Sequence, residues 1–122
     1  MNLRGRKEAE ILARTFRDRL TVKRFRWAVN PQTQESEQVE EVVYDGIRCA
    51  LSQSSNNQPE RRENYSTADR EAVLFTEPGI MLEDNDIAIV TTEAGPVYQG
   101  KTGRTFMYIS HGETPFAAER LA

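Results

Sequence analysis

Residues 72–110 have the sequence AVLFTEPGIMLEDNDIAIVTTEAGPVYQGKTGRTFMYIS, in which short apolar segments alternate with turn signals. The pattern predicts a strand over 72–76, a Pro-Gly turn, a short apolar stretch, an Asp/Asn turn and a strand over 86–92. Two more short strands are expected around a hairpin turn at Gly100–Gly103. Short strands at this spacing are typical of an all-β sandwich or small barrel.

The residues before this stretch continue the pattern. LTVKRFRWAV at 20–29 alternates with period two and predicts a half-buried strand. The polar NPQTQESEQ at 30–38 is a loop or a long hairpin tip. VEEVVYDGIRCALSQ at 39–53 predicts a second strand and a third strand segment, with Asp45-Gly46 as a hairpin turn or a bulge. The expected fold is all-β: a small barrel or sandwich of about six short antiparallel strands.

Period-two placement predicts which side chains fill the core. Those expected to be mostly buried are Val22, Phe25 or Trp27, Val43, Ile47, Cys49, Leu51, Val73, Phe75, Ile87, Ile89, Phe106 and Tyr108.

The N-terminal region differs from the rest of the chain. RKEAEILARTFRDRL at 6–20 predicts an α-helix with an apolar stripe, which must pack on its own barrel or on a neighbouring subunit. We therefore expect a basic helical extension over residues 1–19 and a β domain over residues 20–122, with a long polar loop over residues 53–70.

Charge is unevenly distributed. Residues 1–27 carry nine bases and three acids, a net charge of +6, and the other 95 residues carry seven bases and sixteen acids, a net charge of −9. The basic end is a solvated helix face, a contact to nucleic-acid phosphates or a contact to an acidic face of a neighbour. The candidate protein-interface residues are Lys7, Arg14, Phe16 and Arg17 near the helix, and Arg61, Arg62 and Tyr65 in the polar loop.

Candidate chemistry is sparse. A single cysteine, Cys49, excludes an internal disulfide and a cysteine-based zinc site, and a single histidine, His111, excludes His-pair metal motifs. We expect Ser110 and His111, as neighbours on a strand, to point to opposite faces, and the acids at 83–86 to form an Asx-type turn. The expectation is a non-enzymatic protein with no catalytic residues, no metal and no cofactor. No apolar run is long enough to span a membrane, and no signal-peptide pattern is expected at the N-terminus.

The order of several segments resembles that of the head-closure, or head–tail joining (connector, stopper), proteins of tailed bacteriophages. The segments are RDRLTVKRF, YDGIRCALSQ, a polar loop, VLFTEPGIMLEDNDIAIV, a glycine hairpin and FMYISHGETPF. The residues that carry the resemblance are Leu20–Val22, Gly46–Ser52, Val73–Phe75, Ile80, Asp84–Val90 and Tyr108–Glu113. One departure is Asn85-Asp86, where that family usually has Gly-Asp.

The resemblance implies a structural virion protein in the neck between head and tail, made in the bacterial host cytoplasm. Its subunits would form a ring, expected to be a dodecamer, below the portal or adaptor. The ring would retain packaged DNA and provide the tail attachment surface. Its partners would be copies of itself, an adaptor or portal-side protein above, a tail protein below and passively contacted DNA, with no membrane.

Two alternatives remain open. One is a tail-completion or tail-terminator ring protein, which ring symmetry would distinguish. The other is a nucleic-acid-binding small β-barrel, in which Phe25 and Trp27 would stack on bases beside Lys23, Arg24 and Arg26.

Overall fold

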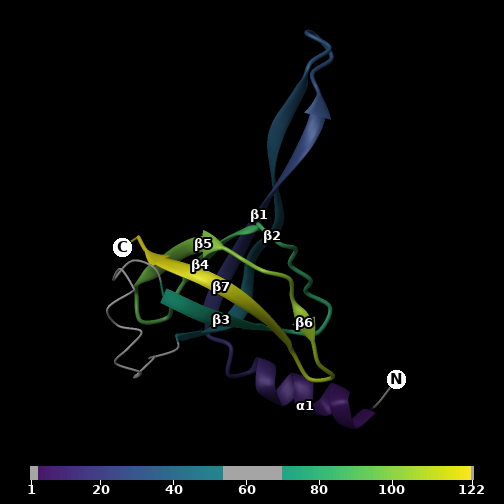
Figure 1. Ribbon diagram of the computed structural model, residues 1–122. Coiled ribbons are helices and arrows are strands. Elements are labelled where there is room, and N and C mark those ends of the chain that lie inside the picture. Colours follow the sequence, from purple (N-terminus) through teal and green to yellow (C-terminus); the bar gives the residue numbers. More distant parts are fainter. Residues whose placement is uncertain (1–2, 54–69, 122) are drawn as a thin grey trace, which may run out of the picture.

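The computed structural model describes residues 3–53 and 70–121. Within these residues the chain forms one helix, α1 (Leu3–Ala13), and seven strands (Figure 1). The strands are β1 (Asp18–Val29), β2 (Ser36–Gln53), β3 (Arg70–Thr76), β4 (Ile87–Thr91), β5 (Val97–Lys101), β6 (Phe106–Met107) and β7 (Gly112–Arg120). The predicted all-β fold with one N-terminal helix is confirmed. The predicted loop lies outside the described residues, apart from Gln53 and Arg70 at the ends of β2 and β3.

The strands form one antiparallel sheet in the order β3-β2-β1-β4-β5-β7-β6. β3, at one end of this order, also pairs with β7, near the other end, from Arg70↔Ala118 to Thr76↔Gly112. The sheet therefore curls into a small barrel, which is partly open because β5 and β7 share only two residue pairs. Alternate side chains point inward, as the pleat requires. The buried core consists of Leu20, Val22, Cys49, Ala72, Leu74, Leu82, Ala88, Val90, Phe116 and Ala118.

Small residues are needed where the barrel narrows. A Cβ added to Gly100 on β5 would overlap the backbone carbonyl oxygen of Ala117 on β7. Glycine at this position therefore lets the two strand backbones approach and pair.

The predicted register of two strands is wrong by one residue. On β3 the buried residues are Ala72 and Leu74, while Val73 and Phe75 are only half-buried. On β4 the buried residues are Ala88 and Val90, while Ile87 and Ile89 are half-buried. On β4 the small Ala88 fits the packed interior, and the larger Ile87 and Ile89 occupy the outer face.

Other core predictions divide into three groups. Val22 and Cys49 are buried, as predicted. Val43, Ile47 and Leu51 are half-buried and pack against the core. Phe25, Trp27, Phe106 and Tyr108 are exposed, and their prediction as core residues is wrong.

The predicted helix is too long at its C-terminal end and too short at its N-terminal end. The observed helix, α1, ends at Ala13, and just beyond this end the Thr15 hydroxyl donates to the Leu12 carbonyl at 2.6 Å. Asp18 then begins β1 because its carboxylate accepts hydrogen bonds from the backbone N–H groups of Leu51 and Glu93, at 2.9 and 3.0 Å. The first strand accordingly begins at Asp18, two residues before the predicted strand.

Strand β7 has no counterpart in the sequence prediction, although it pairs with β3, β5 and β6. Its Pro115 and its short Thr and Ala side chains weaken the usual strand signal. The same strand also explains why the predicted hairpin around Gly100–Gly103 is wrong. β5 and β6 each pair with β7 rather than with one another.

Residues 39–53 form part of one continuous strand rather than two segments. Opposite Thr21, the two residues Asp45 and Gly46 form a bulge, with Gly46 at φ +63°. The bulge is one of the two alternatives that the sequence left open, and it increases the local twist of the β1–β2 pair.

Candidate functional site

The β1–β2 hairpin projects from the barrel as a two-stranded ribbon (Figure 1). β4 accompanies β1 only over residues 19–23, and no other strand of the described residues pairs with the hairpin beyond that point. We call residues 24–41 the arm. Its six-residue strands span about 20 Å at about 3.3 Å per residue. An isolated two-stranded ribbon is only marginally stable in water, so the arm calls for support at its base or along its faces.

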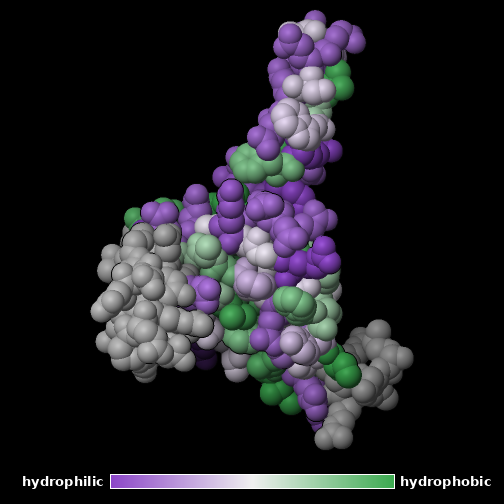
Figure 2. All heavy atoms as spheres, viewed as in Figure 1, coloured by the Kyte–Doolittle hydropathy of each residue, from purple (hydrophilic) through white to green (hydrophobic). Residues whose placement is uncertain are grey.

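One face of the arm is apolar. Phe25, Trp27 and Val29 alternate along β1 and therefore lie on the same face, all three exposed, with Trp27 at 71 %. Their cross-strand neighbours on that face are polar: Glu40, Gln38 and Ser36. Figure 2 shows the arm as a narrow projection on which apolar and intermediate residues lie among hydrophilic ones.

The opposite face of the arm is charged and internally paired. Arg26 lies 3.2 Å from the Glu41 carboxylate, and Val39 is the exposed apolar residue on this side. On the apolar side, Lys23 at the base forms a 3.0 Å ion pair with Glu40. Exposed cross-strand pairs of this kind fix the register more than they add stability.

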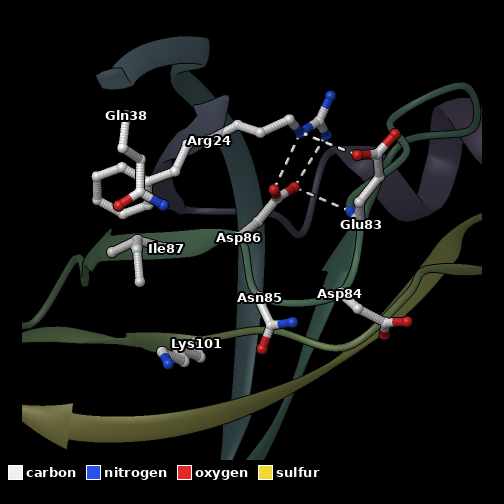
Figure 3. Close-up of a pocket in the computed structure, with 9 residues that line it drawn as sticks. Arg24, Gln38, Glu83, Asp84, Asn85, Asp86, Ile87 and Lys101 are labelled. Atoms are coloured by element: carbon white, nitrogen blue, oxygen red, sulfur yellow. Dashed lines mark hydrogen bonds and ion pairs between the residues drawn. The ribbon is translucent and has the colours of Figure 1, made fainter. Parts of the chain in front are cut away.

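A buried ion pair fixes the base of the arm (Figure 3). Arg24 donates from Nε and Nη2 to the two carboxylate oxygens of Asp86, at 3.0 and 2.9 Å. Asp86 is 2 % exposed and also accepts the backbone N–H of Glu83 at 2.9 Å. This clamp ties the arm to the turn before β4. The hydrogen bonds and charge of Asp86 raise the pKa of the Arg24 guanidinium.

The turn that supplies Asp86 is itself held in place. Asn85 has φ +69°, and its backbone N–H donates to the backbone carbonyl of Thr102. The backbone N–H of Thr102 donates in turn to the backbone carbonyl of Asp86. The acids at 83–86 thus form a structural turn beside a polar hollow of about 430 Å³ at the base of the arm. Within the described part of the chain, no three His, Cys, Asp or Glu side chains are grouped to hold a metal ion.

A second exposed apolar surface consists of β6 and the start of the turn from β6 to β7. Phe106, Met107, Tyr108 and Ile109 are consecutive and all exposed, with Ile109 at 67 %. We call residues 106–109 the apolar turn. It lies toward the end of the barrel opposite the arm, where α1 also lies (Figure 1).

Hydrogen bonds and ring contacts order the apolar turn. The His111 ring stacks on Tyr108, with centroids 5.2 Å apart, while its Nδ1 lies 2.8 Å from the Ser110 hydroxyl and its Nε2 3.1 Å from Glu113. The expectation that Ser110 and His111 point apart is wrong, because the chain bends here instead of continuing as a strand. Phe75 contacts the same ring, with centroids 5.7 Å apart.

The predicted interface residues have different environments. Lys7 and Arg14 are exposed, and no described side chain pairs with either. Arg17 forms a 3.4 Å ion pair with Glu93 in which both side chains are well exposed. Phe16 is buried within the subunit, so it is not available to a partner. Arg61, Arg62 and Tyr65 lie outside the described residues.

Cys49 is chemically protected. Burial, reinforced by the charge of Asp18, raises the pKa of its thiol to about 12. The thiolate is the nucleophilic form of cysteine, so this residue is a core side chain and not a reactive group.

The main sequence prediction placed apolar residues of the arm and of the apolar turn in the core, and only the nucleic-acid-binding alternative exposed Phe25 and Trp27. In both, alternating aromatic and aliphatic residues had predicted burial. The available signal was the surrounding charge: Phe25 lies between Arg24 and Arg26, and Trp27 follows Arg26.

Of the helices in the described residues, none is long and apolar enough to cross a membrane. Comparison with protein-family models, with curated proteins and with solved structures gives no match to this chain.

Proposed function

We propose that this chain is a structural subunit of the bacteriophage neck, a head–tail connector of the head-closure or stopper type. In this role it forms a ring below the portal or adaptor, retains packaged DNA and provides the surface to which the tail attaches. The role is non-catalytic and needs no cofactor. It places the protein in the virion.

The observation that carries the proposal is the arm. A ribbon of about 20 Å that presents Phe25, Trp27 and Val29 to solvent is a poor arrangement for a subunit that acts alone. Exposed tryptophan and phenylalanine are enriched in protein interfaces, where their burial supplies much of the binding energy. The small barrel and the resemblance of its segments to phage neck proteins support the same role.

The distribution of charge favours protein contacts over nucleic-acid contacts. Of the nine bases in residues 1–27, the three on or beside the arm, Lys23, Arg24 and Arg26, are paired with acids of the same subunit. A stacking platform for single-stranded DNA needs unpaired cations beside its aromatics. The nucleic-acid-binding alternative is therefore disfavoured.

The proposal is tested with DNA-filled heads from a phage in which this gene is disrupted. We expect these heads to leak DNA and fail to join tails, and purified protein to restore both properties. Mutant heads that retain DNA and accept tails normally would contradict the proposal. Electron microscopy then separates the connector from the tail-terminator alternative, because the first predicts a ring with the portal's twelvefold symmetry and the second a sixfold tail ring.

A further inference from the structure

We propose that the apolar face of the arm docks on the apolar turn of an adjacent copy of this chain. The contact is head-to-tail: each subunit contributes its arm on one side and its apolar turn on the other. This inference deepens the proposed function and rests on the ring that it requires.

The first argument is position. The arm points away from its own barrel, and the apolar turn lies toward the opposite end (Figure 1). A rigid subunit cannot bring these two surfaces together within itself. Two different, complementary surfaces on one chain form a heterologous interface, which generates a ring when the rotation closes.

The second argument is shape and apolar character. Trp27 at 71 % and Ile109 at 67 % exposure are among the most exposed large apolar side chains in the described residues. Each belongs to a short row of neighbours: Phe25 and Val29 on the arm, and residues 106–108 in the turn. Covering one row with the other removes both from water in a single contact.

The third argument is charge. Residues 27–41 contain four acids and no base. Two of them are paired with Lys23 and Arg26, but no described cation pairs with Glu35 or Glu37. The distal arm is therefore apolar and acidic.

The opposite end of the barrel is apolar and basic. Arg104 lies two residues before the apolar turn. It is exposed, and no described acid pairs with it. Lys7 and Arg14, in and just after α1, are exposed, and no described side chain pairs with either. An acidic, apolar arm and a basic, apolar end fit one another, and like charges disfavour the arm-to-arm alternative.

The single tryptophan makes the contact measurable without a label. As protein concentration rises and the ring assembles, the Trp27 emission should shift to shorter wavelength and its quenching by acrylamide should fall. Ile109→Ser, on the other surface, should abolish both changes and weaken self-association by at least about tenfold, as expected for a central interface residue. Val39→Ser, on the opposite face of the same arm, is the matched control and should leave both unchanged. Circular dichroism checks that each variant is folded.

Mixed cysteine variants locate the contact. Trp27→Cys protein mixed with Ile109→Cys protein should give a cross-linked dimer with a short bismaleimide, and the buried Cys49 should not react. Val39→Cys mixed with Ile109→Cys should not cross-link.

Two results would overturn the inference. In one, rings form with unchanged Trp27 emission and without the 27–109 cross-link. In the other, Trp27 becomes buried only when a different neck or tail protein is added. In both cases the DNA-retention test described above would still stand, so failure of this contact is separable from failure of the proposed function.

Discussion

Replacing Asp86 with alanine should loosen the arm at its base and destabilise the whole subunit, because Arg24 would keep only its 3.4 Å ion pair with the exposed Glu83. The substitution removes a 2 % exposed carboxylate that accepts two hydrogen bonds from Arg24 and one from the backbone of Glu83. Breaking a fully buried ion pair costs about 3–5 kcal/mol. Arg24 is 27 % exposed and can partly rehydrate, so we expect a loss of about 2–3 kcal/mol.

Urea unfolding followed by circular dichroism measures this loss, and thermal unfolding should show a Tm lowered by roughly 10 °C for a domain of this size. Arg26→Ala is the matched control. It removes a neighbouring arm arginine whose ion pair with Glu41 is largely exposed, and it should cost less than about 1 kcal/mol. If Asp86→Ala proved no more destabilising than Arg26→Ala, the clamp would not be what holds the arm.

Three further outcomes are expected. Because burial raises the pKa of Cys49 to about 12 in the folded state, the unfolded chain loses its thiol proton at lower pH. The free energy of unfolding should therefore fall between about pH 9 and 12, by up to about 1.4 kcal/mol per pH unit. Cys49→Ala should remove this slope, and an unchanged slope would contradict the assignment. Gly100→Ala should destabilise the barrel by about 1–3 kcal/mol or more through its clash with Ala117, whereas Gly103→Ala, with room for a Cβ, should be nearly neutral in the same urea titration. Ser110 should not be labelled by a fluorophosphonate probe, since its hydroxyl orders a turn in this interpretation; stoichiometric labelling would instead indicate an activated nucleophile.

The sequence predicts the fold class well because turn chemistry and strand alternation are local. Pro78-Gly79 and Asn85-Asp86 mark the turns on either side of the predicted short apolar stretch, and β3 and β4 lie within two residues of their predicted bounds. Which face of a strand points inward is a different matter. In Ile87-Ala88-Ile89-Val90 both faces are apolar, and only the packing of the folded barrel selects Ala88 and Val90 as the inward residues.

The candidate site was less predictable, since the exposure of the arm depends on where the neighbouring strand β4 ends. Residues 24–29 have the alternation of an ordinary half-buried strand, but β4 ends its pairing at Lys23. Asp86 was equally hard to recognise. An acid in an Asp/Asn turn is usually solvated, and its burial depends on Arg24, which lies 62 residues earlier in the chain. Long-range partners of this kind leave no trace in a local pattern.

The position of β7 in the chain also sets an order of assembly for the barrel. β1 and β2 are adjacent in sequence and can pair locally, whereas β3 and β5 receive a common neighbour only when residues 112–120 arrive. Until then both strands present open backbone edges, which are templates for pairing with other chains. A chain that lacks β7 would therefore retain the β1–β2 hairpin but expose the unpaired backbone edges of β3 and β5. Aggregation of truncated or slowly folding chains is thus a hazard built into this topology.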